Sequence, residues 1–569
     1  MQVGMNTIII FNAVARKIFS LFCVLTLLLT VNNAKAQKSY DVVVYGGSSG
    51  GFTAAIQVAR MGKSVALVEP GKHIGGNIVE GLGSTDIDNH KEFQNSLALG
   101  GLALEFYKRI AKAYNRTAAF EKMLANREKD MTLWKTESSV AEKIIQGWLA
   151  EYKIDVLLES RMKEGKNGIL KQGKTLKQIR LEDGRTLAAK VFIDATLEGD
   201  LLAASGVQTI VGREANSMYG ESLNGIRGQT THAQFAVKVD PYKIPGDPSS
   251  GLIPTIQADE LGTPGMGDKN IQAYCFRVCL TKVGSNKIPF SPPPGYDRAQ
   301  YEIYLRYLKA GGKLYVPKAN LSNGKTDLGA WHDLSHNLYG MNKDYPEAGL
   351  AGRKKILDQH TTFTKGLFYF LSTDTAVARL APSLQKEWSE WGYARDEFED
   401  NGGFPRNFYI RDARRMVSDY VITEKVGRKD DAEEVRDAVA VAYWPMDVHS
   451  VRRIVRNGYA YNEGFVFAGA YWKAFGISQK ALVPRASECD NLLTPTCPSA
   501  THIAFGSMRL EHNFMDLGQV CGTMAVMALN KSVPVQNVLY EELRHRLLAD
   551  GIFTNASKLP LPLEKKVGK

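Results

Sequence analysis

A glycine-rich turn between two short apolar runs constrains this chain more than any other feature. Residues 41–45 are mostly β-branched, residues 46–51 read GGSSGG, and residues 52–61 have the alanine spacing of a helix packed on a sheet. A second apolar run at 64–68 ends in Glu69. This order of strand, turn, helix, strand and acid predicts a parallel βαβ unit that binds a dinucleotide.

Each residue type in this unit has a physical role in holding a pyrophosphate. Gly46 permits the sharp turn, and Gly51 permits close packing of the helix, whose first N–H groups face the phosphate charge. Ser48 replaces the middle glycine of the usual fingerprint, and its hydroxyl can donate to the phosphate. Glu69 can accept both hydroxyls of a ribose. The predicted cofactor-binding residues here are Gly46, Gly47, Ser48, Ser49, Gly50, Gly51 and Glu69.

The segment after Glu69 favours FAD over a nicotinamide dinucleotide. A second glycine doublet, Gly75 and Gly76, follows within a few residues and precedes Asn77. Backbone that passes close to FAD is typical of flavoproteins, whereas nicotinamide domains normally continue into another crossover helix. We therefore predict FAD, with the doublet and Asn77 as further contacts. His73 is expected to serve the cofactor through hydrogen bonds, with covalent flavin attachment as the alternative.

A series of motifs further along the chain resembles a known family. The motifs lie at 193–196, 199–200, 211–214, 219–225, 272–277, 411–416, 446–449 and 482–523. On these residues, the chain resembles the FAD-dependent oxidoreductases of the glutathione-reductase-like superfamily. It is most similar to a bacterial branch whose members often carry the label "xanthan lyase". The resemblance covers most of the chain and implies FAD-dependent redox chemistry, but no particular substrate.

The resemblance also implies further cofactor contacts. In flavoproteins of this fold the backbone of the strand predicted at 155–158 meets the adenine, which makes Val156 a candidate. A helix predicted to begin within 513–523 would direct its N–H groups at the flavin's pyrimidine and stabilise negative charge there. The inner flavin motif corresponds to Asp194, Ala195 and Thr196, and the helix contacts correspond to Leu517, Gly518 and Gln519.

The predicted fold class is α/β: a Rossmann-like FAD-binding domain, made of a parallel sheet and a β-meander, with an inserted α+β substrate domain. Proline-rich segments and short strands predicted at 234–239 and 273–280 distinguish the insert from the flanking sequence. The predicted organisation is a signal peptide at 1–36, an FAD-binding domain at 37–205 and 485–535, the insert at 206–484, and a C-terminal helix and tail at 536–569.

The first 36 residues have the pattern of a secretory signal peptide. Basic residues at 16–17 precede a mostly apolar run at 18–31, and residues 34–36 read as a small-x-small cleavage site. The apolar run is short for a membrane span. We predict Sec-type export to the periplasm or the medium, with no stable membrane span after cleavage; an uncleaved anchor is the alternative.

Charge and cysteine content exclude several classes of protein. The net charge of +11 is not gathered in a Lys/Arg block, so nucleic acid is not expected as a partner. No CxxC motif lies near the fingerprint, which excludes the dithiol chemistry of disulfide reductases. Pairing of Cys489 with Cys497 across a turn is left open. No cluster of His, Cys and carboxylates has metal-ligand spacing, so no metal is predicted.

Candidate catalytic residues are less directly marked. In an extended segment His449 shares a face with Asp447, an arrangement suited to acid–base work; a structural histidine is the alternative. Arg509 and Glu511 precede the predicted flavin-facing helix, where the fold places them near the isoalloxazine; a structural ion pair is the alternative. The arginines within 411–415 share one side of a predicted helix and could bind an anion or form surface ion pairs.

Three functions are compatible with these patterns. The first is an exported FAD-dependent oxidase or dehydrogenase of a small polar substrate, such as a sugar or sugar acid. The second is a reductase of an unsaturated acid, and the third is a non-catalytic flavin-fold scaffold associated with glycan use. No second dinucleotide fingerprint follows the first. Electrons are therefore expected to pass to an external acceptor, namely oxygen, a quinone or a carrier protein.

Overall fold

A mixed sheet of seven strands organises the FAD-binding domain in the computed structural model, which describes residues 38–230, 232–469 and 472–560. The predicted signal peptide lies outside these residues. The strand order is β3-β2-β1-β6-β5-β4, and β18 pairs in parallel with β6. The strands are β1 (Lys38–Tyr45), β2 (Val65–Val68), β3 (Asp155–Leu157), β4 (Ile169–Gln172), β5 (Thr175–Arg180), β6 (Thr186–Asp194) and β18 (Leu492–Leu493).

The parallel and antiparallel parts of this sheet confirm the predicted fold class. β1 pairs in parallel with β2 and β6, and β2 pairs in parallel with β3. β4, β5 and β6 form the predicted antiparallel meander. The buried runs of Val, Ile and Ala in β1 and β2 fit strands that are covered on both faces.

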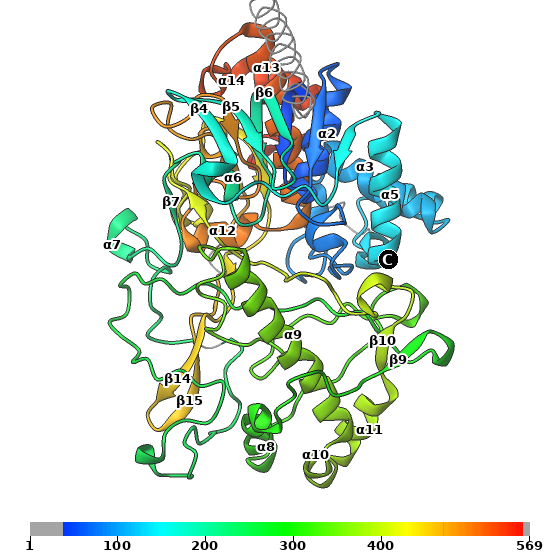
Figure 1. Cartoon of the computed structure of the whole chain (residues 1–569), viewed down its shortest axis with the longest axis vertical. Helices are drawn as coiled ribbons and strands as arrows, with labels where there is room; N and C mark the ends of the chain where they lie inside the picture. Colours follow the sequence, from blue (N-terminus) through cyan, green and yellow to red (C-terminus); the bar gives the residue numbers. More distant parts are fainter. Residues whose placement is uncertain (1–37, 231, 470–471, 561–569) are drawn as a thin grey trace, which may run out of the picture.

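Helices from both ends of the chain cover one face of the sheet. α2 (Ser49–Arg60) packs along α13 (Glu511–Lys531), and α13 also packs against α3 (Gly101–Ala113). α5 (Ser138–Glu151) joins the same hydrophobic core, and α14 (Tyr540–Ala549) packs against α13. Figure 1 shows these early and late segments together in the upper part of the molecule.

The inserted segment forms a second core of mixed α+β character. Aromatic residues dominate this core, among them Tyr274, Phe276, Phe368 and Trp388. Figure 1 shows this region as the lower, green-to-yellow half of the molecule. Its main elements are α8 (Glu302–Lys309), α9 (Leu350–Thr373), α10 (Thr375–Leu380), α11 (Pro382–Glu390), the sheet β8-β10-β9 (Leu280–Thr281, Gly392–Ala394, Lys287–Pro289) and the hairpin β14–β15 (Arg452–Arg456, Tyr459–Glu463).

The end of the predicted insert packs with the FAD-binding domain. β12 (Ala438–Ala442) pairs with β17 (Phe475–Ser478) and packs against α13. Ile422, Val439 and Ile477 belong to the same core as the helices on the sheet. This part of the predicted insert therefore belongs to the core of the FAD-binding domain and is separate from the second core.

Three local predictions for the insert are wrong. Residues 234–239 form no strand. Of residues 273–280 only Leu280 belongs to a strand, β8, while Cys275 and Val278 form isolated bridges to Tyr409 and Leu328, because the partner changes before a ladder can extend. The segment 411–415 is extended instead of helical and ends in β11 (Arg415–Met416). Its arginines therefore diverge, and each has partners of its own.

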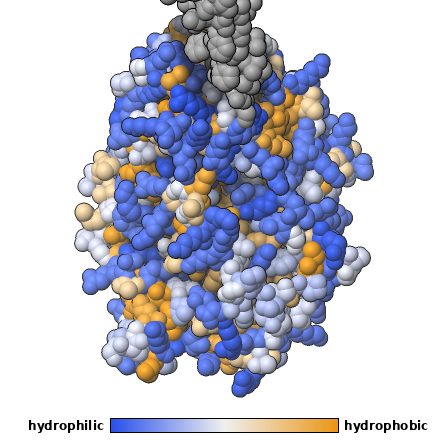
Figure 2. Space-filling view, viewed as in Figure 1, coloured by the Kyte–Doolittle hydropathy of each residue, from blue (hydrophilic) through white to orange (hydrophobic). Residues whose placement is uncertain are grey.

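The surface and the cysteines add two observations. Among the described residues no helix has both the length and the apolar character needed to cross a membrane. Hydrophilic residues predominate on the face shown in Figure 2, where hydrophobic residues form small separate patches, one of them over β14 and β15. Cys489 and Cys497 are buried as free thiols, so they do not pair in this structure.

Candidate cofactor and active site

A cavity of about 510 Å³ opens where β1 and β6 end. The turns after these two parallel strands both line it, through Gly46, Gly47 and Ser48 on one side and Ala195 and Thr196 on the other. Crevices at the carboxyl ends of parallel strands are the usual ligand sites of open α/β sheets. The cavity therefore lies where the sequence places the dinucleotide.

The glycines of the turn are required by close backbone contacts. Gly46 has φ +105°, and a Cβ there would lie 2.5 Å from the backbone of Ala195 and Thr196. A Cβ on Gly51 would lie 2.0 Å from the carbonyl oxygen of Gly46. No side chain fits at either position, so the turn presents bare backbone to the cavity.

Ser48 has a different role from the one predicted. Its hydroxyl donates to the carbonyl oxygen of Ala195 at 2.6 Å and accepts from the N–H of Gly51 at 3.3 Å, which caps α2. The hydroxyl proton is therefore used within the protein instead of being free for a phosphate. The N–H groups of Gly51 and Phe52 bond to Ser48, so those of Ser49 and Gly50 are the donors that the start of α2 offers to an anion.

Glu69 holds two turns at the edge of the cavity. Its carboxylate accepts from the N–H of Gly47 at 2.7 Å and from the N–H of Gly71 at 2.6 Å. Burial raises its pKa to about 7, while these two hydrogen bonds oppose the shift. Each oxygen keeps a further lone pair, so the carboxylate can also accept from ribose hydroxyls.

The second glycine doublet forms the next part of the wall. Gly75 and Gly76 have φ values of +136° and +59°, and the N–H of Gly75 donates to the carbonyl oxygen of Gly47 at 2.7 Å. Gly76 and Asn77 line the cavity, and the amide of Asn77 donates to Glu511 at 2.8 Å. The doublet therefore brings bare backbone beside the phosphate-binding turn.

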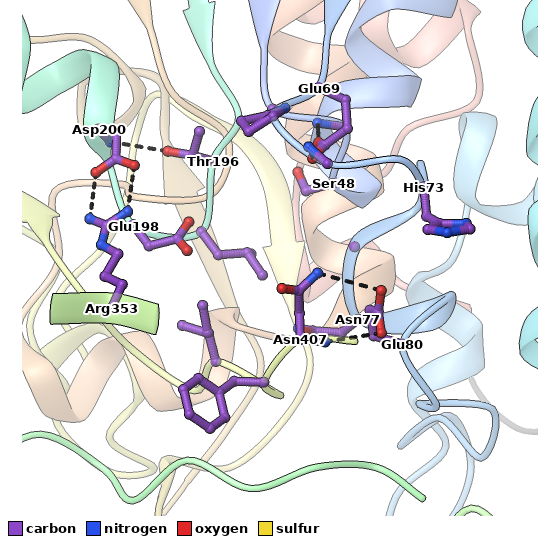
Figure 3. A pocket seen from close by; sticks show the side chains of 18 of the residues that line it. Ser48, Glu69, His73, Asn77, Glu80, Thr196, Glu198, Asp200, Arg353 and Asn407 are labelled. Atoms are coloured by element: carbon purple, nitrogen blue, oxygen red, sulfur yellow. Dashed lines mark hydrogen bonds and ion pairs between the residues drawn. The ribbon is translucent and has the colours of Figure 1, made fainter. Parts of the chain in front are cut away.

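The insert supplies the opposite wall. Arg353, on α9, donates to both carboxylate oxygens of Asp200 at 2.7 Å each. Asp200 begins α6 (Asp200–Ala204), directly after the inner flavin motif. Figure 3 shows this pair on the side of the pocket opposite Glu69 and Ser48. The bidentate pair holds α9 over the cavity.

These features fit an FAD. The donor set consists of free backbone N–H groups, a helix N-terminus and a ribose-facing carboxylate, and the bare turn leaves room for a pyrophosphate. Both ring nitrogens of His73 are already within hydrogen-bond distance of carboxylates, at 2.7 Å from Glu142 and 3.0 Å from Asp400. The covalent attachment considered for His73 therefore has no free nitrogen to use in this arrangement.

Several predicted contacts lie away from the cavity wall. Val156 is half-buried in β3 at the edge of the sheet, and Asp194 bonds instead to the N–H of Leu202 at 2.8 Å and to Thr196. Burial raises the pKa of Asp194 to about 7. Asp194 thus fixes the turn that presents Ala195 and Thr196, and the predicted adenine contact of Val156 stays a prediction.

The predicted helix start at Leu517 to Gln519 is wrong. α13 begins at Glu511, so these residues lie well inside the helix with their N–H groups already bonded. A Cβ on Gly518 would lie 2.2 Å from the carbonyl oxygen of Gly50, and Gln519 accepts from the N–H of Leu102 at 2.7 Å. Gly518 and Gln519 therefore pack α13 onto α2 and α3. The free N–H groups of α13 belong to its first turn, which begins at Glu511.

Glu511 lies at the cofactor turn. One carboxylate oxygen accepts from the hydroxyl of Ser49 and the other from the amide of Asn77. Burial raises its pKa to about 7. The structure does not pair Glu511 with Arg509, which removes the ion pair considered as its alternative.

Arg509 faces a second group of charged residues, which we call the arginine cluster: Asp86, Arg277, Tyr409, Arg411, Asp447, His449 and Arg509. Its guanidinium donates to the hydroxyl of Tyr409 at 3.0 Å and to the backbone carbonyl of Asp447 at 3.1 Å. The guanidinium carbons of Arg277 and Arg411 lie 5.5 Å and 5.3 Å from the centre of the Tyr409 ring. Tyr409 thus joins three arginines.

His449 belongs to the arginine cluster. Its backbone N–H donates to Gln272 at 2.9 Å, and its ring lies 5.3 Å from that of Phe465. Burial, together with the charges of Arg411, Arg509 and Arg277, lowers its pKa well below the ordinary value, so the imidazole is neutral. Asp447 lies two residues earlier, and the predicted acid–base pairing of the two side chains stays a prediction.

The arginine cluster adjoins the cofactor cavity through one extended segment. Phe408 and Ile410 line the cavity, while Tyr409 between them contacts Arg509. Successive side chains of an extended chain point to opposite faces, so this segment separates the two sites. Sequence reasoning missed Tyr409 and Asp86. Gln272 and Arg277 lie in the family motif at 272–277, which was the one sequence signal that could have pointed to them.

The comparison with known families agrees with this site. A family described as FAD dependent oxidoreductase matches residues 41–547, so the chain belongs to this family. It is an FAD-dependent oxidoreductase, and FAD is its cofactor, as the two glycine motifs predicted. No curated protein matches the chain. The described residues contain no group of three or more His, Cys, Asp or Glu that could hold a metal ion.

Several solved structures match part of the chain. L-proline dehydrogenase from P. horikoshii is 16% identical over 32% of this chain and 59% of its own, with a TM-score of 0.23. L-amino acid deaminase from Proteus vulgaris is 15% identical over 32% of this chain and 53% of its own, with a TM-score of 0.22. The chain thus spans little more than half the length of these proteins, and the fold assignment rests on the sheet order described above.

Proposed function

We propose that this protein is an exported FAD-dependent oxidase or dehydrogenase of a small polar substrate, such as a sugar or sugar acid. The observation that carries this proposal is the arginine cluster, to which His449 belongs and whose Tyr409 lies between two residues that line the cofactor cavity. Oxidation of a hydroxyl removes a proton and a hydride. When bound, FAD supplies the hydride acceptor, and His449 accepts the proton.

Export is part of the proposal because of the N-terminal sequence. The basic residues, apolar run and small-x-small site predict cleavage after residue 36. Expression of the full chain in a bacterium should place the shortened protein in the periplasmic fraction or the medium. Deletion of residues 2–36 should leave it in the cytoplasm, and a full chain retained there uncleaved would contradict export.

The redox proposal is tested by anaerobic reduction. Oxidised enzyme is mixed without oxygen with a panel of sugars and sugar acids, and loss of the visible flavin absorbance is followed. We expect at least one member to bleach the flavin, and His449→Asn to slow the bleaching by about 10²-fold or more while the FAD content is retained. Bleaching by no member of the panel would contradict the proposal.

A second candidate function is reduction of an unsaturated acid. The buried guanidinium of Arg509 favours it, because a clamped carboxylate would polarise a neighbouring alkene. Photoreduced enzyme that reoxidises rapidly with fumarate, combined with no bleaching by any sugar or sugar acid, would select this alternative. Reoxidation by air, a quinone or a carrier protein alone would favour the oxidase or dehydrogenase.

A further inference from the structure

Two buried arginines of the arginine cluster, Arg411 and Arg509, make no hydrogen bond to a carboxylate of the described residues. Arg277 is matched by Asp327, to which it donates twice at 2.6 Å. Arg509 instead bonds to a phenol and a backbone carbonyl, and its distance to the nearest oxygen of the Asp447 carboxylate is 3.6 Å. Arg411 bonds to the carbonyl of Ala330 at 2.8 Å and to the amide oxygen of Asn337 at 3.2 Å.

Asp447, Asp86 and Asp412 act on Arg509 electrostatically, but within the described residues none of them accepts a hydrogen bond from its guanidinium. Burial and the charge of Asp447 raise the pKa of Asp86, which weakens Asp86 as a counter-charge. The arginines in turn lower the pKa of His449. Gln272 adds a buried donor, because its amide nitrogen has no partner within the described residues while its amide oxygen accepts from His449. A buried cation and a free donor together favour an anion.

The arginine cluster is partly exposed and lies close to the cofactor turn. The side chains of Asp86, Asp447 and His449 are half-buried, whereas Arg411 and Arg509 are buried. Arg509 lies two residues before Glu511, which bonds to the phosphate-binding turn through Ser49. A small molecule that reaches Arg509 from the half-buried side would therefore lie beside the cofactor cavity.

We propose that Arg509 and Tyr409 bind a carboxylate of the substrate, so that the enzyme acts on hydroxy acids, sugar acids among them, in preference to neutral alcohols. This inference rests on the proposed oxidation of a polar substrate and names its class. A guanidinium matches a carboxylate with two parallel hydrogen bonds, and the phenol of Tyr409 supplies a third donor.

A bound carboxylate would also make His449 a stronger base. The arginine charges disfavour a proton on His449 in the free enzyme, and a substrate anion beside them would offset that effect. The groups that face His449 are Arg277, Arg411, Arg509 and Gln272. A neutral analogue would leave the imidazole a weak base, so charge recognition and proton transfer favour the same substrates.

The test compares acids with their neutral amides: glycolate with glycolamide, and glucuronate with glucuronamide. Binding is measured by thermal shift, with and without bound FAD, and by perturbation of the flavin spectrum at constant ionic strength. We expect saturable binding of the acids and about 10- to 100-fold weaker binding of the amides, the range expected for loss of one charged hydrogen-bonding group. No saturable response to either acid, or equal responses to acid and amide, would overturn the inference.

Variants assign the preference to named residues. Arg509→Met should abolish the preference for acids, Arg509→Lys should reduce it partly, and Tyr409→Phe should reduce it without removing it. Arg436→Met is the matched control, because it removes the same charge from a side chain that is 89% exposed. An unchanged preference in folded Arg509→Met, or in Arg509→Lys if the first variant does not fold, would also overturn the inference.

The outcomes separate this inference from the proposed function. If acids bind through Arg509 but never bleach the flavin, the carboxylate site stands and the oxidation proposal fails. If neutral sugars bleach the flavin and show no preference for the acid, the oxidation proposal stands and the carboxylate site fails. Thermal shift does not need the flavin, so the anion site is also decided in protein that has lost it.

Discussion

The cofactor turn and the arginine cluster adjoin each other but are built in opposite ways. The turn holds its buried carboxylates with neutral donors: backbone N–H groups bond to Glu69, while Ser49 and Asn77 bond to Glu511. The cluster holds its guanidinium groups mainly with carbonyls and a phenol. Arg277 hydrogen-bonds to Asp327, whereas Arg509 lies 3.6 Å from the Asp447 carboxylate.

This difference indicates how each site selects its ligand. The turn itself has no cationic side chain, although Arg161 and Lys354 line the same cavity, so it binds a pyrophosphate through bare backbone, the helix dipole and close shape. In the arginine cluster, Arg411 and Arg509 make no hydrogen bond to a carboxylate that the structure describes, so their charge can act on a bound anion. Cofactor binding should therefore be sensitive to single atoms of added bulk, and substrate binding should be sensitive to charge.

The largest expected effect comes from added bulk in the turn. Gly51→Ala places a Cβ 2.0 Å from the carbonyl oxygen of Gly46, so we expect almost complete loss of bound FAD and a large fall in the melting temperature. Gly147→Ala is the matched control, since its Cβ meets nothing within 4 Å and it lies within α5. That control should gain about 0.5–1 kcal/mol. Normal FAD content in Gly51→Ala would contradict the inference that cofactor binding at the turn is sensitive to added bulk.

The next effect tests whether charge matters in the cluster. Asp327→Asn removes the fully buried carboxylate that pairs with Arg277, whose side chain is 16% exposed, and should cost about 3–5 kcal/mol in the free energy of unfolding. Asp431→Asn removes a 69% exposed partner of Arg428 and should cost less than about 1 kcal/mol. Urea unfolding measures both changes. Equal losses of unfolding free energy in the two variants would mean that the Arg277–Asp327 pair stabilises the protein no more than an exposed ion pair does.

The cofactor turn could be predicted from sequence because its determinants are contiguous. The strand, the turn through Gly46 and Gly51, the helix and Glu69 make their main contacts within one βαβ unit, and the structure has all four in the predicted order. The use of the Ser48 hydroxyl was missed, because its acceptor, Ala195, follows a distant strand. The start of α13 was also missed, since no glycine or proline lies between Met508 and Glu511.

The arginine cluster could not be assembled from sequence. Asp86, Arg277, Tyr409, His449 and Arg509 come from five separate segments, and no local periodicity records that these segments meet. The insert was difficult for the same reason: Cys275 and Val278 each pair with a single residue of a distant segment, so the strand-like pattern of residues 273–279 forms no ladder. His449 and Arg509 were found individually, but their common partner, Tyr409, was not.

A smaller effect sharpens the role of hydrogen bonding in the turn. Glu69→Gln keeps the size of the side chain but places an amide donor against a backbone N–H of Gly47 or Gly71. We expect FAD affinity to fall by about 10- to 100-fold, equivalent to one charge-assisted hydrogen bond. Titration of flavin-stripped protein with FAD measures the change. Glu182→Gln, at an exposed position, is the control and should bind FAD normally.

The last prediction concerns the pH dependence of the turn. The pKa of Glu511 is raised to about 7 by burial, against an ordinary value of 4.5, so the folded state holds this proton more tightly than the unfolded state does. Between these two pH values the folded protein binds more protons. The free energy of unfolding must therefore fall as the pH rises through this window, and the stabilising contribution is complete only below it.

Glu511→Gln should reduce this slope, by at most about 1.4 kcal/mol per pH unit for one proton. It should not remove the slope, because the pKa values of Glu69, Glu80 and Asp194 are also raised to about 7. Urea unfolding of flavin-stripped protein at pH 4.5 to 8 gives the slope, with Glu182→Gln as the unchanged control. An unaltered slope in Glu511→Gln would show that Glu511 is ionised throughout. Its two neutral donors would then compensate burial fully, and the turn would tolerate negative charge as readily as the cluster tolerates positive charge.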